Sequence, residues 1–423
     1  MKKLRIGFVG ISNFSMSFIK LFKMHPDVEE IAVCDLVPER IAEAVEKLGP
    51  TRNYSSFDDM LENGKDLNCI AVFTQRHLHA PMVIKALEAG KHVYSAVPIA
   101  CTVEEIAQII EKVKETRQIY MMGETCYYFP CAIYCREQYE KGEFGKFVYA
   151  ESQYYHDICE MYEVFQRGGG ENWRFDAGIP PMFYPTHSVS MVFSAIHEHA
   201  LTVSAFGLRD DGRDGIYGAG RNRWDNPFSN ETALFRMSGG GVVRTNEFRR
   251  IGINKPSSYI TCFYGDMGAY ECSVTQHTFQ KGEAAGKENV CLHDVGPLLN
   301  TIRYNEELNS PEGLKARKNS WRYVDGYAPI HDLGRLPKCF RNIPNTGHYN
   351  SHPFLVDDFV RAVVEEKLPP NNAWDAARYM LPGLTAHESA LRDGELLHVP
   401  DFGDAPADWE KLVLVKKDYY ENC

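Results

Sequence analysis

The sequence predicts a protein of two domains, in which an α/β domain over residues 1–125 is followed by an α+β domain over residues 126–423. A chain of 423 residues is longer than one hydrophobic core usually supports. As far as residue 123, short apolar runs alternate with segments of helical spacing, which indicates a parallel sheet with helices on both faces. Beyond about Thr125, apolar and polar residues alternate, which is typical of a large, mostly antiparallel open sheet.

Strands and helices are expected to alternate throughout the first domain. The helix over residues 14–24 shows the pattern well, because Phe18, Leu21 and Phe22 fall on one face. Gly90 is a typical helix stop. The strands are expected at residues 3–9, 30–35, 69–74, 92–95 and 119–123, and the helices at residues 14–24, 38–48, 57–62, 79–89 and 103–116.

The second domain is expected to combine strands, long loops and C-terminal helices. Gly239–Gly241 is interpreted as a hairpin between two strands rather than a phosphate-binding loop. Residues 207–230 and 276–352 are rich in loop-forming residues, and loops this long are usually functional. Helices are predicted over residues 354–366 and 373–392, and packing of these helices on the first domain is the alternative. The strands are predicted at residues 147–155, 202–206, 232–237, 242–248 and 258–264.

Composition and charge exclude several classes of protein. With 44% hydrophobic and 24% charged residues, the chain resembles an ordinary globular protein. A net charge of −11 without any block of Lys or Arg argues against binding to nucleic acid or to an anionic membrane. No apolar stretch reaches the roughly 20 residues that span a bilayer. We therefore expect a cytoplasmic protein that binds a small molecule.

Cysteine and histidine spacing gives no sign of a disulfide framework or a metal site. The 12 cysteines are scattered without a Cys-x-x-Cys pair, so we expect free, mostly buried thiols. His197 and His199 are spaced to share one face of a strand, but no further ligand motif accompanies them. No metal is expected.

A turn near the N-terminus has the position of a dinucleotide-binding loop. The segment GISNFS starts at Gly10, directly after the first strand and before the first helix. In such a turn, glycines allow the backbone to approach the diphosphate, which is held at the helix N-terminus. Only the first glycine is present, since Ser12 and Ser15 stand where the later ones belong. The turn residues expected to contact the cofactor are Gly10, Ser12, Asn13 and Phe14.

A carboxylate at the end of the second strand predicts which dinucleotide binds. Asp35 lies 25 residues after Gly10, where an acid accepts hydrogen bonds from the adenosine ribose. Its charge would repel the 2′-phosphate of NADP, so the sequence predicts a Rossmann domain that binds NAD. Arg40 follows five residues later and leaves NADP as the alternative.

Together these motifs are similar to those of the Gfo/Idh/MocA oxidoreductase family over nearly the whole chain. The segments that carry the resemblance include IGFVGISNFS, AVCDLVPERIAEA, VFTQRHLHAPMVIKALEAGKHVYSAVPIACTVEE and KGEFGKFVYAESQYYHD. Within the family, the chain looks most like the branch that holds NAD-dependent α-N-acetylgalactosaminidase-like glycosidases. That second resemblance lies in AVP at 96–98, MMGETCYY at 121–128, YYHD at 154–157 and YPTHS at 184–188.

The resemblance implies roles for several residues, and it also has gaps. It assigns Thr74 and His79 to the cofactor side and His187 to catalysis. Most of the family reads Glu-Lys-Pro where this chain reads Ala96, Val97 and Pro98, so these three residues line the cofactor without the usual lysine. The aspartate that usually precedes the catalytic histidine by four residues is replaced by Phe183. The family also implies a homodimer or homotetramer built on the open sheet.

Oxidation of a sugar hydroxyl needs a base, and without the lysine His187 is the first candidate and Tyr184 the second. A free histidine titrates near 6.5, whereas a tyrosine near 10 needs a lowered pKa. Glu124, at the end of a predicted parallel strand, is expected to orient the substrate or to act as acid and base. Core packing is the alternative interpretation for His187 and Tyr184, and a solvent-exposed loop acid is the alternative for Glu124. The residues expected to line the substrate are Glu124, Tyr128, His156, Asp157, Trp173, Arg174, Tyr184 and His187.

Three functions agree with these observations. The first is an NAD-dependent oxidoreductase that oxidises a ring hydroxyl of a sugar or glycoside, with C3 as the leading position. The second is a redox glycosidase that retains its NAD and cleaves a glycoside by oxidation, elimination, addition of water and reduction. The third is a sugar or NAD sensor without catalytic activity.

Overall fold

The computed structural model describes residues 3–211, 214–252, 259–272, 277–282, 291–301 and 326–422. The chain divides into two compact units, and neither is continuous in sequence. Unit 1 comprises Met1–Thr125, Asp332–Ala377 and Phe402–Cys423, and unit 2 comprises Cys126–His331 and Arg378–Asp401. The C-terminal third of the chain therefore contributes to both units.

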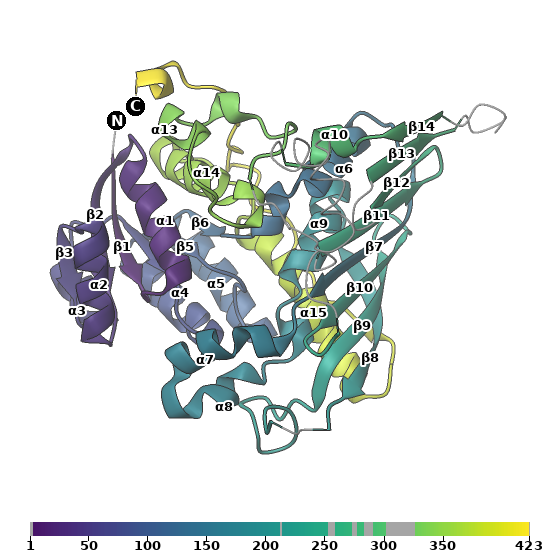
Figure 1. Cartoon of the computed structure of the whole chain (residues 1–423), viewed down its shortest axis with the longest axis horizontal. Coiled ribbons are helices and arrows are strands. Elements are labelled where there is room, and N and C mark those ends of the chain that lie inside the picture. Colours follow the sequence, from purple (N-terminus) through teal and green to yellow (C-terminus); the bar gives the residue numbers. More distant parts are fainter. Residues whose placement is uncertain are drawn as a thin grey trace, which may run out of the picture. The chain divides into compact units, whose positions relative to one another are not determined.

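Unit 1 is built on a parallel sheet of six strands in the order β3-β2-β1-β4-β5-β6 (Figure 1). All of its strand pairs are parallel, as the alternation of strands and helices predicts. The short strand β3 was not predicted, because three residues are too few to show an apolar pattern. The strands are β1 (Leu4–Val9), β2 (Val28–Cys34), β3 (Arg52–Tyr54), β4 (Cys69–Val72), β5 (His92–Ser95) and β6 (Tyr120–Met122).

The helices of unit 1 begin where capping residues stand. Ser12, Ser56 and Thr102 each accept a hydrogen bond from a backbone N–H of the first turn of a helix. Of these helices, α14 is almost wholly buried, which its apolar residues on several faces explain. The helices are α1 (Asn13–Met24), α2 (Pro38–Leu48), α3 (Phe57–Asn63), α4 (His79–Glu88), α5 (Val103–Thr116), α13 (Lys338–Arg341) and α14 (His352–Glu365).

Unit 2 is built on a sheet of nine strands in the order β14-β13-β12-β11-β7-β10-β9-β8-β15. It is mostly antiparallel, as predicted, and β7 with β10 is its parallel pair. The hairpin expected at Gly239–Gly241 joins β9 to β10. The strands are β7 (Phe147–Tyr155), β8 (Ala200–Arg209), β9 (Phe228–Met237), β10 (Val242–Phe248), β11 (Tyr259–Gly265), β12 (Gly268–Cys272), β13 (His277–Lys281), β14 (Cys291–Asp294) and β15 (Leu397–His398).

Helices α6 and α9 lie on one face of this sheet (Figure 1). Every residue of α9 is buried, and β7 buries alternate residues toward it, among them Ala150, Ser152 and Tyr154. The candidate catalytic residue His187 of α9 contacts this buried face through Tyr154 of β7. The helices of unit 2 are α6 (Pro130–Glu140), α7 (Tyr162–Gly169), α8 (Trp173–Ala177), α9 (Thr186–Ile196) and α10 (Gly296–Leu299), and α15 (Ala373–Leu391) belongs to it from Arg378 onward.

The structure bears on three further predictions, which concern His197, the C-terminal helix α14 and the loop over residues 276–352. His197 does not start a strand with His199, because it ends α9 with a left-handed backbone at φ 54°. Helix α14 belongs to unit 1 together with Met1–Thr125. Much of the loop predicted over residues 276–352 lies outside the described residues, as does residue 258 of the predicted strand.

Among the described residues, none of the helices combines the length and the apolar character that crossing a membrane requires. The described cysteines are free thiols, most of them buried.

Candidate active site

The dinucleotide turn of unit 1 needs a glycine at its first position. Gly10 has a positive φ of 91°, and a Cβ there would lie 2.6 Å from the carbonyl oxygen of Phe73. Any side chain would therefore collide with the neighbouring β4 segment. The close approach of these two backbones brings the turn to the carboxyl edge of the sheet, where dinucleotides bind.

The two serines that replace the later glycines, Ser12 and Ser15, cap the N-terminal end of α1. Ser12 donates its N–H to Oγ of Ser15 at 2.7 Å, and Ser15 donates its N–H to Oγ of Ser12 at 3.2 Å. This reciprocal capping box satisfies two amides at the helix start. Asn13 and Phe14 follow as the first helical residues, and Phe14 is 38% exposed. The turn keeps the helix N-terminus that an anion needs, with fewer backbone donors than a glycine-rich turn offers.

Asp35 lies directly beside this turn. Its carboxylate accepts the N–H of Ile11 at 2.7 Å and that of Val37 at 2.9 Å, and Arg40 is 3.6 Å away. A carboxylate can accept about four hydrogen bonds, so this group retains capacity for a ribose. Leu36 is 82% exposed and offers an apolar surface for an adenine ring. These residues fit the adenosine half of NAD.

His79 joins the two loops that follow β4 and β5. Its Nδ1 is 2.8 Å from the carbonyl oxygen of Pro98, and its Nε2 is 3.1 Å from that of Thr74. Burial lowers the pKa of His79 to about 4, so the ring is neutral and donates to one carbonyl at a time. His79 thus positions the loops that contain Thr74, Ala96, Val97 and Pro98. Val97 is buried and has no group that could transfer a proton.

Glu124 belongs to unit 1, follows β6 by two residues and is fully buried. Burial raises the pKa of the Tyr94 phenol, and the neighbouring Glu124 raises it further. A Cβ on the preceding residue, Gly123, would lie 2.1 Å from the hydroxyl oxygen of Tyr94. Only glycine therefore allows the strand to bring Glu124 past this tyrosine.

In unit 2, His187 is the second residue of α9 and is 3% exposed. Its imidazole contacts the edges or faces of three tyrosine rings. The centroids of Tyr154 and Tyr184 are both 5.0 Å away, and that of Tyr259 is 6.0 Å away. Tyr154 and Tyr259 also stack on each other at 5.0 Å. We call these four residues together with Cys126 the His187 cluster.

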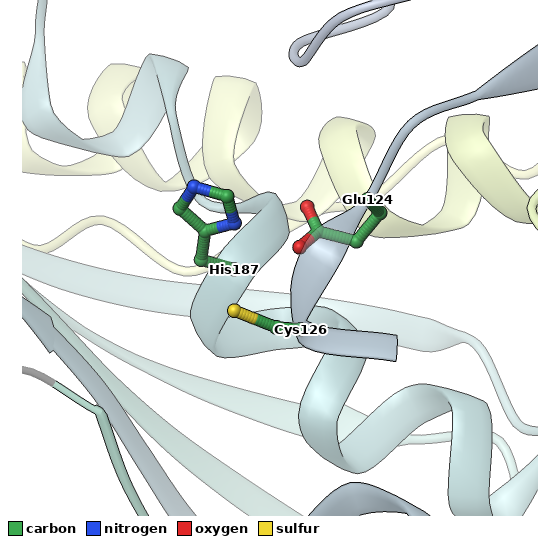
Figure 2. Close-up of side chains that lie close together, drawn as sticks. All are labelled: Glu124, Cys126 and His187. Atoms are coloured by element: carbon green, nitrogen blue, oxygen red, sulfur yellow. The ribbon is translucent and has the colours of Figure 1, made fainter. Parts of the chain in front are cut away.

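Cys126 brings the cluster close to Glu124 along the chain. A ring nitrogen of His187 and Sγ of Cys126 lie within 4.8 Å of each other, and Figure 2 shows both with Glu124. Because consecutive Cα atoms are about 3.8 Å apart, the Cα of Glu124 is within about 7.6 Å of that of Cys126. Chain connectivity through Thr125 therefore keeps Glu124 near the cluster. Tyr128 follows as a buried residue.

A buried ion pair between Glu247 and Arg249 contacts residues that neighbour His187. Ser188 donates from Oγ to Oε1 of Glu247 at 2.5 Å, and Arg249 donates to Oε2 of the same carboxylate at 2.9 Å. Arg249 also lies over the ring of Tyr154, 4.8 Å from its centroid. Burial lowers the pKa of Arg249, but Glu247, Tyr154 and Tyr217 together more than offset this, and the net shift is upward. The charged pair therefore fixes both α9 and one of the tyrosines beside His187.

A second buried acid fixes the segment that precedes Tyr184. Glu231 on β9 lies opposite Glu247 on β10 in the register of the two strands. It accepts the N–H of Met182 at 2.8 Å and lies 2.7 Å from Nδ1 of His387. The ring of His387 is in turn 5.2 Å from Phe183. The position that lacks the family's aspartate is thus occupied by an apolar side chain packed on a buried histidine.

His156 and Asp157, which were expected to line the substrate, have different surroundings. His156 is half-buried, and its Nδ1 is 2.6 Å from the hydroxyl of Tyr154, which links it to the His187 cluster. Its Nε2 is 3.6 Å from a carboxylate oxygen of Glu160. Asp157 instead accepts the N–H of Ile251 at 3.1 Å and a second backbone amide two residues on. Asp157 therefore caps a short helix.

Trp173 and Arg174 are not placed with His187. Trp173 is 6% exposed and belongs to a separate apolar cluster with Ile216 and Tyr217. Arg174 covers its indole at 4.6 Å and donates from Nε to the carbonyl oxygen of Asp214. The core interpretation therefore suits Trp173, because its side chain is buried in this apolar cluster.

Sequence reasoning missed Tyr259, Glu247, Arg249 and Cys126. Inward-facing polar residues at alternate positions of a strand could have revealed Glu247, because buried polar groups in strands are uncommon. Tyr259 and Cys126 carry no such signal, since they reach His187 through the pairing of distant segments.

Comparisons with known proteins agree with this fold. Residues 4–124 match the family model described as an oxidoreductase family with an NAD-binding Rossmann fold. A glycosyl hydrolase family 109 protein of Bacteroides fragilis is 31% identical over 180 residues, which are 41% of this chain and 38% of that protein. An alpha-N-acetylgalactosaminidase of Shewanella oneidensis is 30% identical over 202 residues, which are 45% of this chain and 44% of that protein. The matches thus span less than half of these relatives.

Solved structures show the fold over nearly the whole chain. Levoglucosan dehydrogenase in complex with NADH and L-sorbose has a TM-score of 0.70 at 18% identity, covering 95% of this chain and 100% of that one. A myo-inositol 2-dehydrogenase of Lactobacillus plantarum has a TM-score of 0.65 at 16% identity, covering 94% and 100%. With the intact first glycine, the neighbouring acid and the family match, NAD is confirmed as the cofactor. Over residues 4–124 the chain is therefore similar to the Gfo/Idh/MocA oxidoreductase family with its NAD-binding Rossmann fold.

Proposed function

We propose that this protein oxidises a ring hydroxyl of a sugar or glycoside with NAD, and that C3 carries the reacting hydroxyl. The observation that carries the proposal is the buried imidazole of His187, surrounded by three tyrosine rings and a thiol in unit 2. An imidazole held this tightly between aromatic rings has a fixed orientation, which a proton acceptor requires.

The nicotinamide of NAD supplies a hydride acceptor when it is bound. A protein group must accept the hydroxyl proton. The resemblance implies a lysine for this in most of the family, but this chain has the buried Val97 at that position. His187 takes that proton in our proposal. Tyr184, half-buried and 5.0 Å from it between ring centroids, donates to the sugar or orients the imidazole.

Glu124 is proposed to hold the substrate. Its carboxylate is fully buried, and chain connectivity keeps it near Cys126. A carboxylate accepts two hydrogen bonds from neighbouring hydroxyls readily, which suits the diol pattern of a sugar ring. His156, linked to Tyr154, is the second residue proposed to contact the sugar.

A redox glycosidase is the second candidate, and a specific observation favours it. The relatives that align at about 30% identity carry glycosidase names. In addition, the resemblance implies a lysine in ordinary dehydrogenases where this chain has Val97. In this reaction the sugar becomes a ketone at C3, which acidifies the C2 proton. Loss of that proton and of the C1 aglycone gives an alkene, to which water adds before C3 is reduced again. His187 or Tyr184 would accept and return the protons in these steps.

One experiment separates these functions. The purified protein is incubated with a panel of free sugars and aryl glycosides while NADH absorbance and aglycone release are followed together. A dehydrogenase accumulates NADH with turnover, and a redox glycosidase releases aglycone without net NADH. NADH binding without either signal across the panel would contradict both enzymatic candidates and leave a sensor.

A further inference from the structure

The segment before α14 has a strained backbone. His348, Tyr349 and Asn350 have φ of 53°, 52° and 52°, and Gly347 before them has a φ of 84°. The left-handed conformation is unfavourable for residues with a Cβ, so three in succession are unusual. The side chain of Asn350 holds the turn by accepting the N–H of Thr346 at 2.8 Å. Strain that the surroundings maintain in this way often marks a functional segment.

This turn presents one histidine beside another. Nδ1 of His348 is 3.1 Å from Nε2 of His352, the first residue of α14. His352 is 1% exposed, and burial lowers its pKa well below the usual value, so its ring is neutral and carries one hydrogen. Its Nδ1 is buried without a hydrogen-bond partner among the described residues.

The hydrogen positions follow from this burial. A bare acceptor is tolerated better in a protein interior than an unsatisfied N–H. His352 therefore carries its hydrogen on Nε2 and donates it to Nδ1 of His348. A neutral His348 then has its own hydrogen on Nε2, on the opposite side of the ring.

The pair lies against the helix that receives the cofactor. The ring centroid of His348 is 6.0 Å from that of Phe14 near the start of α1, and His352 stacks on Phe18 at 4.4 Å. Farther along, Phe22 of α1 is 6.1 Å from Phe359 of α14. The two helices therefore run in the same direction, with their N-termini side by side. Both positive helix ends favour an anion at this edge of the sheet.

The cofactor turn offers fewer backbone N–H groups to a ligand than a glycine-rich turn, so an additional donor would strengthen binding. Two of its amides, those of Ser12 and Ser15, are engaged by side chains of the capping box. The diphosphate of NAD carries two negative charges and accepts many hydrogen bonds. A donor from the neighbouring strained turn would complement the remaining backbone amides.

We propose that His348 donates a hydrogen bond from Nε2 to the diphosphate of bound NAD, and that His352 is the positioning residue that fixes its tautomer. The inference deepens the NAD site and rests on NAD binding alone. Its test is therefore an equilibrium measurement without any sugar, so its failure is distinct from failure of the proposed sugar chemistry.

The first measurement is the Kd of NADH by fluorescence titration. His348→Phe preserves a ring against Phe14 but removes the donor, and the Kd should rise about tenfold. His348→Gln places an amide donor near the position of Nε2 and should recover most of the affinity. His398→Phe, on β15 in unit 2, is the matched control and should leave the Kd unchanged. An unchanged Kd in a folded His348→Phe variant would overturn the proposal.

Competition against NADH identifies the contacted group. ADP-ribose contains the diphosphate and should lose the same factor in His348→Phe, whereas adenosine lacks it and should bind equally to both proteins. A parallel loss for adenosine would contradict the assignment, because it would show a general distortion of the site.

The role of His352 has a spectroscopic readout. In protein labelled with nitrogen-15, the imidazole nitrogens of His348 should show hydrogen on Nε2 in the wild type. His352→Leu should redistribute this hydrogen between the two nitrogens, and His352→Gln, which keeps a donor, should restore the wild-type pattern. An Nε2 signal that does not respond to His352→Leu would refute the positioning role.

Discussion

At the scale of single residues, the side chain of His187 determines whether the proposed chemistry occurs. Replacing it with Asn removes the proton acceptor but keeps a small polar group in the cluster. Because a positioned acid or base typically contributes a factor of about 100 to 10,000, turnover should fall at least 100-fold, with little change in NADH affinity. Initial rates and NADH titration on the same preparation test this. A folded, NAD-binding variant with near-normal turnover would eliminate His187 as the base.

Tyr184→Phe is the matched comparison, because it keeps the ring 5.0 Å from His187 and removes only the hydroxyl. It should cost less turnover than His187→Asn if the tyrosine orients the imidazole or donates to the sugar. A larger loss would show that the phenol is itself the base, which would exchange the two roles.

Asp35 should select NAD over NADP. A 2′-phosphate would approach a carboxylate that already accepts two backbone amides, whereas ribose hydroxyls can donate to it. Such charge-assisted hydrogen bonds are worth about 1.5 to 3 kcal/mol, so NADH should bind at least about tenfold more tightly than NADPH. Arg40→Ala is the control, and it should leave the preference for NADH intact. Equal or tighter binding of NADPH by the wild type would refute the selection.

At the scale of elements, the stability of unit 1 depends on a buried ion cluster on α14. Arg335 donates to Asp357 at 3.0 Å and to Asp358 at 2.8 Å, and both carboxylates are fully buried. Arg335→Met would leave two buried acids without this cation and should lower the free energy of unfolding by about 3 to 5 kcal/mol. Urea denaturation measures the change.

The control for this prediction is Lys47→Met, which breaks an exposed ion pair with Glu43 on α2. Exposed pairs contribute about 0 to 1 kcal/mol, so this variant should unfold close to the wild type. If Arg335→Met were no less stable than the control, the buried acids would have to be protonated or otherwise satisfied.

At the scale of the whole molecule, buried histidines should make the fold sensitive to acid. The pKa of His79 and that of His277 are lowered to about 4 by burial, whereas unfolded histidines titrate near 6.5. The unfolded state therefore binds more protons between these values. Stability is complete above about pH 6.5 and is lost as the pH falls toward 4, by about 1.4 kcal/mol per pH unit for each histidine.

His79→Gln tests this for unit 1, because its amide can donate to the carbonyl oxygens of Thr74 and Pro98 without titrating. The difference in urea midpoint between about pH 7 and about pH 5 should be smaller in the variant than in the wild type. An equal difference in both proteins would show that His79 does not contribute to the acid sensitivity.

The outer face of the nine-stranded sheet is where we propose that copies of the chain associate. Phe206 and Leu208 on β8 are 61% and 58% exposed, and Leu234 on the adjacent β9 is 49% exposed. An apolar patch of this kind is typical of an interface. We expect a homodimer or homotetramer by light scattering, and Phe206→Asp combined with Leu234→Asp should dissociate it. Val45→Asp on α2 is the control, and a monomeric wild type at micromolar concentration would disprove the expectation.

The sequence by itself determined the longer elements of unit 1 and the identity of its ligand, whereas the short β3 and α13 were not predicted. Each longer strand and helix is continuous in sequence and carries its own periodicity, and the ends of β5 and α5 agree with the prediction. Gly10 and Asp35 predicted NAD because both act through local backbone geometry at fixed places in a βα unit. The open sheet of unit 2 was also predicted, because alternation within one strand is a local signal.

Only the tertiary structure decided which residues surround His187. Tyr154, Tyr259 and Cys126 come from segments far apart in the chain, and only strand pairing and the burial of α9 bring them together. Trp173 shows the converse, because its aromatic ring suggested a sugar platform and its neighbours made it a core residue. Periodicity records which way a side chain faces, whereas its chemistry depends on the partner it meets there, and that partner is set by long-range packing.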